Sequence, residues 1–334
     1  MLLVTGGAGY IGSHFVKQAV KFEEVLVLDN LSTGHQRAID PAAIFIKGDV
    51  RDVSLLNHLM TFYPINAVVH FAAKSSEEES VRSPHIYYEE NVQGMITLLS
   101  AMHQHRIRTI IFSSTAAVYG HKYVRPFDEM DAVNPITAYA KSKYFMEQIA
   151  ADYSKSYGMN SVAFRYFNAA GAHPSGEIGE CHVEETHVLP VLLKHLLSET
   201  PSFTVNGCIY ETLDGTYIRD FIHVEDIANA HLLALQQVRS KVGYSEIFNL
   251  GSGSGYSVKE LIALSEKVTG HSGVVHYADR REGDPAILIV NAKKAHELLE
   301  WVPSYSIEEI IETAWAWHSQ KEKEFLRDSA AWSK

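Results

Sequence analysis

The chain has 334 residues, 46% of them hydrophobic, and a formal net charge of −11, which is ordinary for a globular protein with a large core. The acidic balance argues against nucleic acid and membrane surfaces as partners, because both need clustered lysine and arginine, and no apolar run is long enough to cross a bilayer. Without a basic leader, and with only Cys181 and Cys208, the chain is expected to be cytoplasmic and free of disulfides.

The first elements predicted along the chain are a short buried strand at 1–4 and a helix at 10–20. The segment VTGGAGYIGSHF joins them, and its glycines fit G-x-G-x-x-G from Gly7 or G-x-x-G-x-x-G from Gly6. Such glycines let the backbone turn tightly and approach a pyrophosphate held at the start of the helix. Taken alone, the motif could also be an ordinary glycine-rich turn.

The second predicted strand favours one dinucleotide over another. The segment EEVLVLDN ends in Asp29, twenty residues beyond Gly9. A carboxylate at this position binds the adenosine ribose hydroxyls and repels a 2′-phosphate. The sequence therefore predicts NAD as the cofactor in preference to NADP.

Further strands are predicted at 44–46, 67–71, 109–112 and 162–167, with helices at about 52–63, 85–104 and 137–157. This alternation predicts an α/β fold with a Rossmann-type, doubly wound parallel sheet. The rhythm breaks after Asn168, and 169–185 is expected to be a long loop, before a late strand within SEIFNLGSGSGYSV and a helix at 258–269. We therefore expect a nucleotide-binding domain at 1–168 plus about 222–250, and a smaller, discontinuous α/β substrate domain at about 169–221 plus 251–334.

The segment YAKSK places Tyr139 and Lys143 on one helix face. Tyrosine is a base near neutral pH only if its pKa falls by about three units, and a nearby ammonium together with an oxidised nicotinamide favours that fall. This pair also occurs by chance on solvated helices. Here it follows FSSTAAVYG, which places Ser113 and Thr115 at the carboxyl edge of the sheet, where Thr115 can bind the same substrate hydroxyl as Tyr139.

Two arginines offer a basic clamp in an acidic protein. Arg219 and Arg281 are able to hold a diphosphate bidentately, although each alone is more often a surface or ion-pair residue. Asn168 follows a predicted strand at the functional edge, where a simple turn role is equally plausible. The 18 histidines are scattered without a metal-ligand pattern, so no metal site is predicted.

Nearly the whole chain resembles the extended short-chain dehydrogenase/reductase family and, within it, the UDP-glucose 4-epimerases. The shared motifs are GGAGYIGSH, LDNLSTG, GDVRD, FSSTAAVYG, YAKSK, FRYFNAAGAHPSGEIGE, DGTYIRDFIHVED and RREGDPA. The resemblance implies catalysis by Thr115, Tyr139 and Lys143, and an NAD site made of Gly6, Gly9, Tyr10, Ile11, Gly12, Asp29, Asn30, Thr33, Gly34, Asp49, Val50, Phe71, Ala72, Ala73, Asn91, Ser113, Tyr139, Lys143 and Phe167. It implies that the UDP-sugar is bound by Thr115, Tyr139, Asn168, His187, Asn206, Arg219, Arg281, Asp284 and Leu288.

The resemblance also implies a reaction, in which Tyr139 removes the proton of the 4-hydroxyl and a transient 4-keto sugar forms before hydride returns to its opposite face. This sequence departs from the family at Glu77 and Glu78, which replace small residues and are expected at a solvated loop tip. Asn206 stands where an aromatic residue is common near uracil. Leu288 replaces a tyrosine that narrows the sugar pocket in some members, so the N-acetylated sugar pair is a further candidate substrate.

Two alternative functions stay open on the sequence. A nucleotide-sugar 4,6-dehydratase shares the fold and the Tyr/Lys pair, but it needs acidic residues after the active-site threonine, where this chain has Ala116 and Ala117. A non-catalytic NAD-sensing protein could keep the fold and lose turnover. In the resembling family the helices at 85–104 and 137–157 pair across a two-fold axis, so their apolar residues Met95, Leu98, Leu99, Phe145 and Ile149 predict a homodimer.

Overall fold

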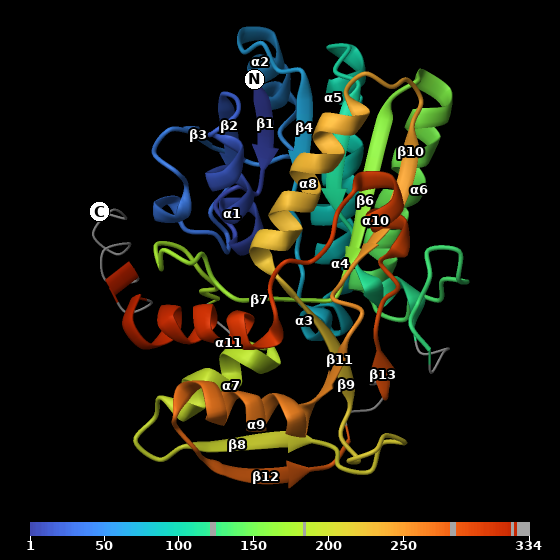
Figure 1. Cartoon of the computed structure of the whole chain (residues 1–334). Helices are drawn as coiled ribbons and strands as arrows, with labels where there is room; N and C mark the ends of the chain where they lie inside the picture. Colours follow the sequence, from blue (N-terminus) through green and yellow to red (C-terminus); the bar gives the residue numbers. More distant parts are fainter. Residues whose placement is uncertain (121–124, 183–184, 281–284, 322–323, 326–334) are drawn as a thin grey trace.

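The computed structural model describes residues 1–120, 125–182, 185–280, 285–321 and 324–325. A large α/β unit lies above a smaller one in Figure 1, and the strands of the large unit point toward the small one. Ligands of open parallel sheets bind beyond the carboxyl ends of the strands. The junction between the two units is therefore the place to look for a site.

Seven parallel strands form the sheet of the large unit, in the order β10-β6-β5-β4-β1-β2-β3. Their bounds are β1 (Leu2–Thr5), β2 (Val25–Asp29), β3 (Ile44–Lys47), β4 (Ala67–His70), β5 (Thr109–Ser113), β6 (Asn160–Tyr166) and β10 (Ser245–Leu250). The order reverses between β1 and β4, as in a doubly wound fold. The predicted fold class is confirmed.

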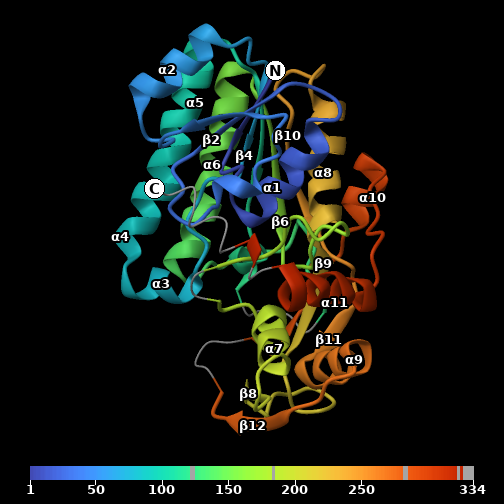
Figure 2. The same cartoon turned by 90° about the vertical axis from the view of Figure 1, so that its left-hand side faces the viewer.

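Helices cover both faces of this sheet, as Figure 2 shows. On one face lie α1 (Tyr10–Ala19), α8 (Val224–Val238) and α10 (Lys293–Leu299), and on the other α2 (Val53–Phe62), α5 (Gly94–Gln104) and α6 (Ala138–Tyr157). Helix α6 begins after the capping residue Thr137 and ends at Gly158, which adopts the left-handed conformation that glycine tolerates. The helix predicted at 85–104 is broken into α4 (Pro84–Tyr87), a π-helical segment (Tyr88–Gln93) and α5.

The smaller unit has its own apolar core between helices and two small sheets. Its helices are α7 (Val188–Leu196), α9 (Val258–Thr269) and α11 (Ile307–Ala316). Strands β8 (Ser202–Asn206) and β12 (Val274–Ala278) form a pair, while β9 (Ile218–His223) pairs with β7 (Asn168–Ala170), β11 (Gly255–Ser257) and β13 (Ile287–Leu288). Short elements elsewhere are α3 (Glu77–Arg82), the 3-10 turns Gln36–Ala38 and Ala116–Tyr119, and the π-helical turn Trp317–Lys321.

Helix α10 departs from the expected division of the chain. Ala295, Leu299 and Trp301 belong to the buried cluster of the large unit, and the indole of Trp301 donates to the carbonyl of Asp226 in α8 at 2.9 Å. The sequence assigned these residues to the substrate domain because they follow residue 250. We therefore propose the two-domain division with about 292–301 moved to the nucleotide-binding domain.

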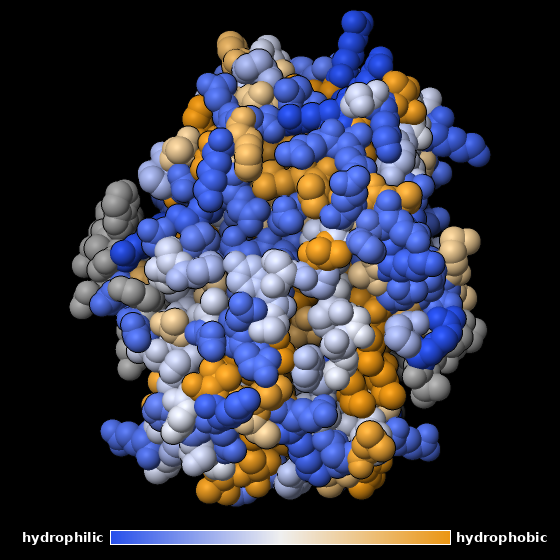
Figure 3. Space-filling model, viewed as in Figure 1, coloured by the Kyte–Doolittle hydropathy of each residue, from blue (hydrophilic) through white to orange (hydrophobic). Residues whose placement is uncertain are grey.

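The surface of the face seen in Figure 1 is mostly hydrophilic, with hydrophobic residues in several separate patches (Figure 3). None of the helices in the described part of the chain is both long and apolar enough to span a membrane.

Candidate active site

The glycine loop between β1 and α1 has the close contacts that a dinucleotide loop needs. Gly6 has φ +75°, and a Cβ there would lie 2.4 Å from the backbone nitrogen of Ala72. A Cβ on Gly12 would lie 2.1 Å from the carbonyl oxygen of Gly6. Gly9 precedes α1 and leaves the first-turn N–H groups without a side-chain cap. The loop fits a pyrophosphate at this helix start, because only glycines allow the backbone to pack this closely.

Asp29 lies at the end of β2 beside that loop. Its carboxylate accepts hydrogen bonds from the backbone N–H groups of Ala8, at 2.9 Å, and Leu31, at 2.8 Å. Burial raises the pKa of Asp29, and these two hydrogen bonds oppose the rise. Asp29 therefore ties the glycine loop to β2, a structural role that sequence reasoning missed, and each carboxylate oxygen still has a lone pair for a ribose hydroxyl.

Asn30, which follows Asp29, forms a hydrogen-bonded group with Asp49 and Arg51. Asn30 donates to Asp49 at 3.1 Å, and the guanidinium of Arg51 binds Asp49 at 2.8 and 2.7 Å, which holds the pKa of Asp49 well below its usual range. Thr33 is exposed, and a Cβ on Gly34 would lie 2.7 Å from the carbonyl carbon of Ala8.

The segment after β4 closes the other side of the glycine loop. The N–H groups of Phe71 and Ala72 donate to the carbonyl of Thr5 at 2.8 and 3.1 Å. Asn91 is fully buried, accepts from the N–H of Lys74 at 2.8 Å and donates to the hydroxyl of Ser142 at 2.9 Å. Asn91 therefore holds the segment 71–74 against α6, which is a positioning role.

Tyr10, Ile11, Val50 and Ala73 complete the cofactor residues implied by the sequence. The hydroxyl of Tyr10 donates to the carbonyl of Gly171 at 2.6 Å, and Ile11 packs on the core of α1 and α8. Val50 is buried beneath the sheet edge, whereas Ala73 is half-buried.

The predicted catalytic residues come together where β5 meets α6. Thr115 lies beside the phenol of Tyr139 and lowers the pKa of that phenol, and its side-chain oxygen accepts from the N–H of Ala117 at 3.2 Å. One turn further along α6, the amine of Lys143 donates to the carbonyl of Ser113 at 2.9 Å and lies 3.3 Å from its hydroxyl. Thr115 and Tyr139 are thus arranged to bind one substrate hydroxyl together.

Burial dominates the acid–base properties of this pair. Burial raises the pKa of Tyr139 to about 12, the hydrogen bond from Thr115 lowers it and the carboxylate of Glu77 raises it further. Burial lowers the pKa of Lys143 to about 7, and Glu147 opposes that change. The amine of Lys143 is directed to Ser113, and burial and Glu77 outweigh Thr115 in setting the pKa of Tyr139.

A buried ion pair supports the catalytic residues from behind. Glu147 lies one turn beyond Lys143 on α6 and accepts two hydrogen bonds from Arg165 of β6, at 2.8 and 2.6 Å. The hydroxyl of Ser114 donates to the same carboxylate at 2.5 Å. Sequence reasoning missed this group, although the spacing of Tyr139, Lys143 and Glu147 places all three on one helix face.

Several predicted substrate residues meet around β9. The amide of Asn168 donates to the carbonyl of Asp220 at 2.9 Å. The guanidinium of Arg219 donates to the carbonyls of Ile218 and Pro285, both at 2.9 Å, and lies over the ring of Tyr217. In β13, Leu288 pairs in register with Arg219. These contacts fix Asn168, Arg219 and Leu288 beside one another.

The other residues predicted to bind the substrate do not all lie around β9. Leu288 and Phe167 both pack on the cluster of Tyr119 and Phe127, which connects the implied sugar residue to the implied cofactor residue. Asn206 ends β8 in the smaller unit, where it pairs with Ala278 of β12. Arg281 and Asp284 lie outside the described residues.

His187, which precedes α7, belongs to a charged cluster that the sequence did not predict. Its ring contacts the buried carboxylate of Glu180 and lies 3.8 Å from a carboxylate oxygen of Glu185. His182 lies 3.2 Å from Glu180 and 3.5 Å from Glu185. Burial lowers the pKa of both histidines, but the two carboxylates outweigh it, so that the pKa of His182 rises to about 10 and that of His187 is also raised.

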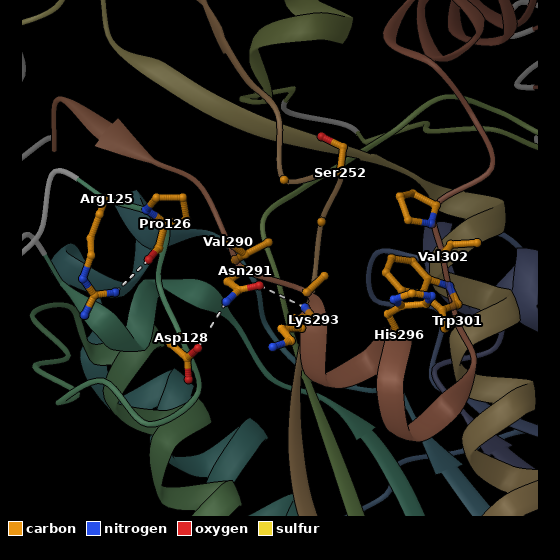
Figure 4. Close-up of a pocket in the computed structure, with 14 residues that line it drawn as sticks. Arg125, Pro126, Asp128, Ser252, Val290, Asn291, Lys293, His296, Trp301 and Val302 are labelled. Carbon is orange, nitrogen blue, oxygen red and sulfur yellow. Dashed lines mark hydrogen bonds between the residues drawn. The ribbon is translucent and has the colours of Figure 1, made fainter.

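A cavity of about 590 Å³ lies elsewhere, between the loop after β10 and α10. Figure 4 shows Asn291 at its centre, hydrogen-bonded to the carboxylate of Asp128 at 3.2 Å and to the N–H of Lys293 at 3.0 Å. None of the described residues predicted for the catalytic, cofactor or substrate sites lines it. This cavity is therefore separate from the candidate active site.

Comparison with known proteins agrees with this geometry. The model of the NAD dependent epimerase/dehydratase family matches residues 2–251. The chain belongs to this family. A UDP-glucose 4-epimerase of Halalkalibacterium halodurans is 47% identical over 321 residues, which cover 96% of this chain and 96% of that protein. The resemblance inferred from the sequence motifs is confirmed.

Solved structures of family members extend the agreement to the fold. The crystal structure of UDP-glucose 4-epimerase from Brucella ovis in complex with NAD has a TM-score of 0.90 and 41% identity, over 95% of this chain and 98% of that chain. That of the Bifidobacterium longum enzyme in complex with NAD+ and UDP has a TM-score of 0.89 and 34% identity, over 96% of this chain and 98% of that chain.

Proposed function

We propose that the protein is a UDP-glucose 4-epimerase, which interconverts UDP-glucose and UDP-galactose through a transient 4-keto sugar with tightly bound NAD. The observation that carries this proposal is the convergence of Tyr139, Thr115 and Lys143 where β5 meets α6, at the carboxyl edge of the sheet. A phenol and a hydroxyl that share one ligand position suit removal of a proton from a sugar hydroxyl.

The chain's own residues supply binding and proton transfer. The glycine loop accommodates the pyrophosphate, Asp29 binds the adenosine ribose, and bound NAD supplies the hydride acceptor and donor for carbon 4. Thr115 orients the 4-hydroxyl, and Tyr139 takes its proton and later returns it. Lys143 holds the strand end at Ser113 and contributes positive charge when it is protonated.

The nucleotide half of the substrate is proposed to bind on the smaller unit. Arg219 and, by resemblance, Arg281 hold the diphosphate. The amide of Asn168 and the ring of His187 are further hydrogen-bond donors to the substrate. Asp284 and Asn206 are assigned to the same half by resemblance. A firmly held UDP and a loosely held hexose let the keto sugar turn over within the site, because inversion needs both of its faces presented in turn.

The test incubates purified protein with UDP-galactose and identifies the products by chromatography. Formation of UDP-glucose without net consumption of NAD supports the proposal. We expect Tyr139→Phe to lower turnover by roughly 10²–10⁴-fold, with Tyr157→Phe, the same change on an exposed turn of α6, as the matched control. A dehydrated keto sugar would instead identify a 4,6-dehydratase, and absence of any product would indicate an NAD-sensing protein.

We propose a homodimer formed through α5, α6 and the π-helical segment before α5. The sequence named Met95, Leu98, Leu99, Phe145 and Ile149 for this contact. The first three are fully buried within their own chain and Ile149 is partly buried, whereas Phe145 is exposed. Exposed apolar side chains on the same elements are Tyr88, Ile96, Phe145 and Tyr157. Their gathering on neighbouring helices supports an isologous contact in place of the buried residues.

Sedimentation velocity at micromolar concentration tests the dimer. Phe145→Glu is expected to give monomers, because it places a charge in the apolar contact. Phe22→Glu is the control, since Phe22 is 70% exposed just beyond α1, on the face of the sheet opposite to α5 and α6. A monomeric native protein would refute the assignment.

A cytoplasmic location is also proposed. The sequence has only two cysteines, the buried Cys181 and the exposed Cys208, and so few cysteines suit a reducing compartment.

A further inference from the structure

The loop between β7 and α7 brings two histidines and two glutamates to one point. One side-chain nitrogen or oxygen from each of Glu180, His182, Glu185 and His187 lies within 4.8 Å of the corresponding atoms of the other three. Oε1 of Glu180 is common to both histidines, because it contacts Nδ1 of His182 and Nδ1 of His187. Such a convergence of nitrogen and oxygen ligands is the arrangement from which zinc sites are built.

A second observation concerns Glu185. Its Oε1 accepts hydrogen bonds from the N–H groups of Thr186 and His187, both at 3.0 Å, which fixes the carboxylate at the start of α7. Its Oε2 is buried and has no hydrogen-bond partner, and the side chain is only 8% exposed. The recorded charge partner of this oxygen is Nδ1 of His182 at 3.5 Å, which makes no hydrogen bond to it, and a cation bound directly to the oxygen would replace that long contact.

We propose that Glu180, His182, Glu185 and His187 bind a divalent transition-metal cation, of which Zn²⁺ is the best match. Two imidazoles and two carboxylates suit zinc, cobalt and nickel, whereas magnesium prefers oxygen ligands alone. Ligands of a tetrahedral zinc site lie about 3.4 Å apart, given bonds of about 2.1 Å. Zinc binding therefore requires the most widely separated ligand atoms, which lie within 4.8 Å of each other, to move closer together. It also requires Oε1 of Glu180 and Nδ1 of His187 to move apart.

The backbone carbonyls of Glu180 and Cys181 are held by hydrogen bonds, so the shifts at this end of the cluster fall on side chains. The indole of Trp317 hydrogen-bonds the carbonyl of Glu180 at 2.8 Å, and the ring of His35 hydrogen-bonds the carbonyl of Cys181 at 3.1 Å. The rings of His182 and His187 are 30% and 48% exposed, which leaves a path for a cation from solvent. A preorganised backbone with two accessible imidazoles favours binding without refolding of the loop.

The test uses untagged full-length protein with its bound NAD, stripped of metal by EDTA and dialysed at pH 8. Zn²⁺ binding is measured by equilibrium dialysis, and Co²⁺ is added as a spectroscopic probe because tetrahedral Co²⁺ has strong visible absorption bands. We expect one saturable site per chain. Removing one ligand with His182→Ala should weaken binding at least about tenfold, since even changes outside the ligand set cost 10–100-fold.

His195→Ala is the matched control, because His195 is an exposed histidine on α7 whose ring bonds to the carbonyl of Val191 and lies edge-on to Phe203, outside the cluster. Glu185→Gln preserves side-chain volume and serves if His182→Ala does not fold. Zinc binding in the native protein that is lost in both cluster variants and kept in His195→Ala supports the site. Absence of saturable binding, or equal binding in all variants, overturns it. Epimerisation by the EDTA-treated protein reports separately on the proposed function.

Discussion

Replacing Glu147 by glutamine tests how the catalytic helix is anchored to the sheet. The side chains of Glu147 and Arg165 are 0% and 3% exposed, and two hydrogen bonds of 2.8 and 2.6 Å join them. Glu147→Gln removes the negative charge and turns one acceptor into a donor that faces the guanidinium. Arg165 then stays buried beside Tyr119 without its counter-charge.

The structure gives a magnitude for this change. Removing one member of a buried ion pair costs about 3–5 kcal/mol, because the remaining charge is left without water or a partner. The surface pair of Lys294 and Glu246 provides the control, since its side chains are 28% and 34% exposed. Glu246→Gln should therefore cost less than about 1 kcal/mol in the free energy of unfolding.

Urea unfolding at a fixed excess of NAD, followed by circular dichroism, measures both variants. The double variant Glu147→Gln/Arg165→Met removes both charges and should recover most of the loss, because the buried pair itself adds little net stability. A loss below about 1 kcal/mol in Glu147→Gln, or a double variant less stable than the single one, would refute this reasoning. Glu147 raises the pKa of Lys143, so Glu147→Gln should lower that pKa. As the pH is raised, the variant should therefore lose the activity that needs protonated Lys143 at a lower pH than the native enzyme does.

Three further predictions concern the ligand sites. Asp29→Asn should weaken NAD binding by about tenfold or more, because a hydrogen bond to a charged group contributes about 1.5–3 kcal/mol, and unchanged affinity by calorimetry would exclude Asp29 from the cofactor site. Glu77→Gln should lower the pKa of Tyr139 and move the acid limb of the pH–rate profile to lower pH, whereas Glu78→Gln should not, since Glu78 pairs with Arg82 at 3.4 Å. Leu288→Tyr should reduce turnover of the N-acetylated sugar pair selectively, by about 10–200-fold; equal losses in kcat/KM on both pairs would make Leu288 a packing residue.

The sequence was sufficient for the sheet and for its functional edge. Each sheet strand contains a short apolar run, and residues such as Asp29 and Ser113 stand directly at the strand ends. Parallel strands bring those ends to one edge, so proximity in space followed from order along the chain. Helix boundaries were predictable where a capping residue was present, as at Thr137 and Gly158 of α6.

Features that depend on long-range contacts were not predictable in this way. Strands β7 and β13 have three and two residues, too few to show a period of two. Helix α10 joins the large unit through the packing of Trp301, which no local pattern encodes. The zinc-site cluster lacks a repeated helical spacing, because its ligands belong to a loop rather than to one helix face.

The acid–base state of Tyr139 shows most clearly where sequence reasoning stopped. Helical spacing placed Lys143 on the same face, but the effect of its amine depends on where that amine is directed, and it donates to Ser113. Burial leaves the phenol with a pKa of about 12 and the amine with a pKa of about 7. Positive charge on a bound ligand would lower the pKa of Tyr139, because an opposite charge nearby favours the ionised phenol. Because a nicotinamide ring is positively charged only when oxidised, Tyr139 is expected to act as a base only when the site holds the oxidised cofactor that the reaction requires.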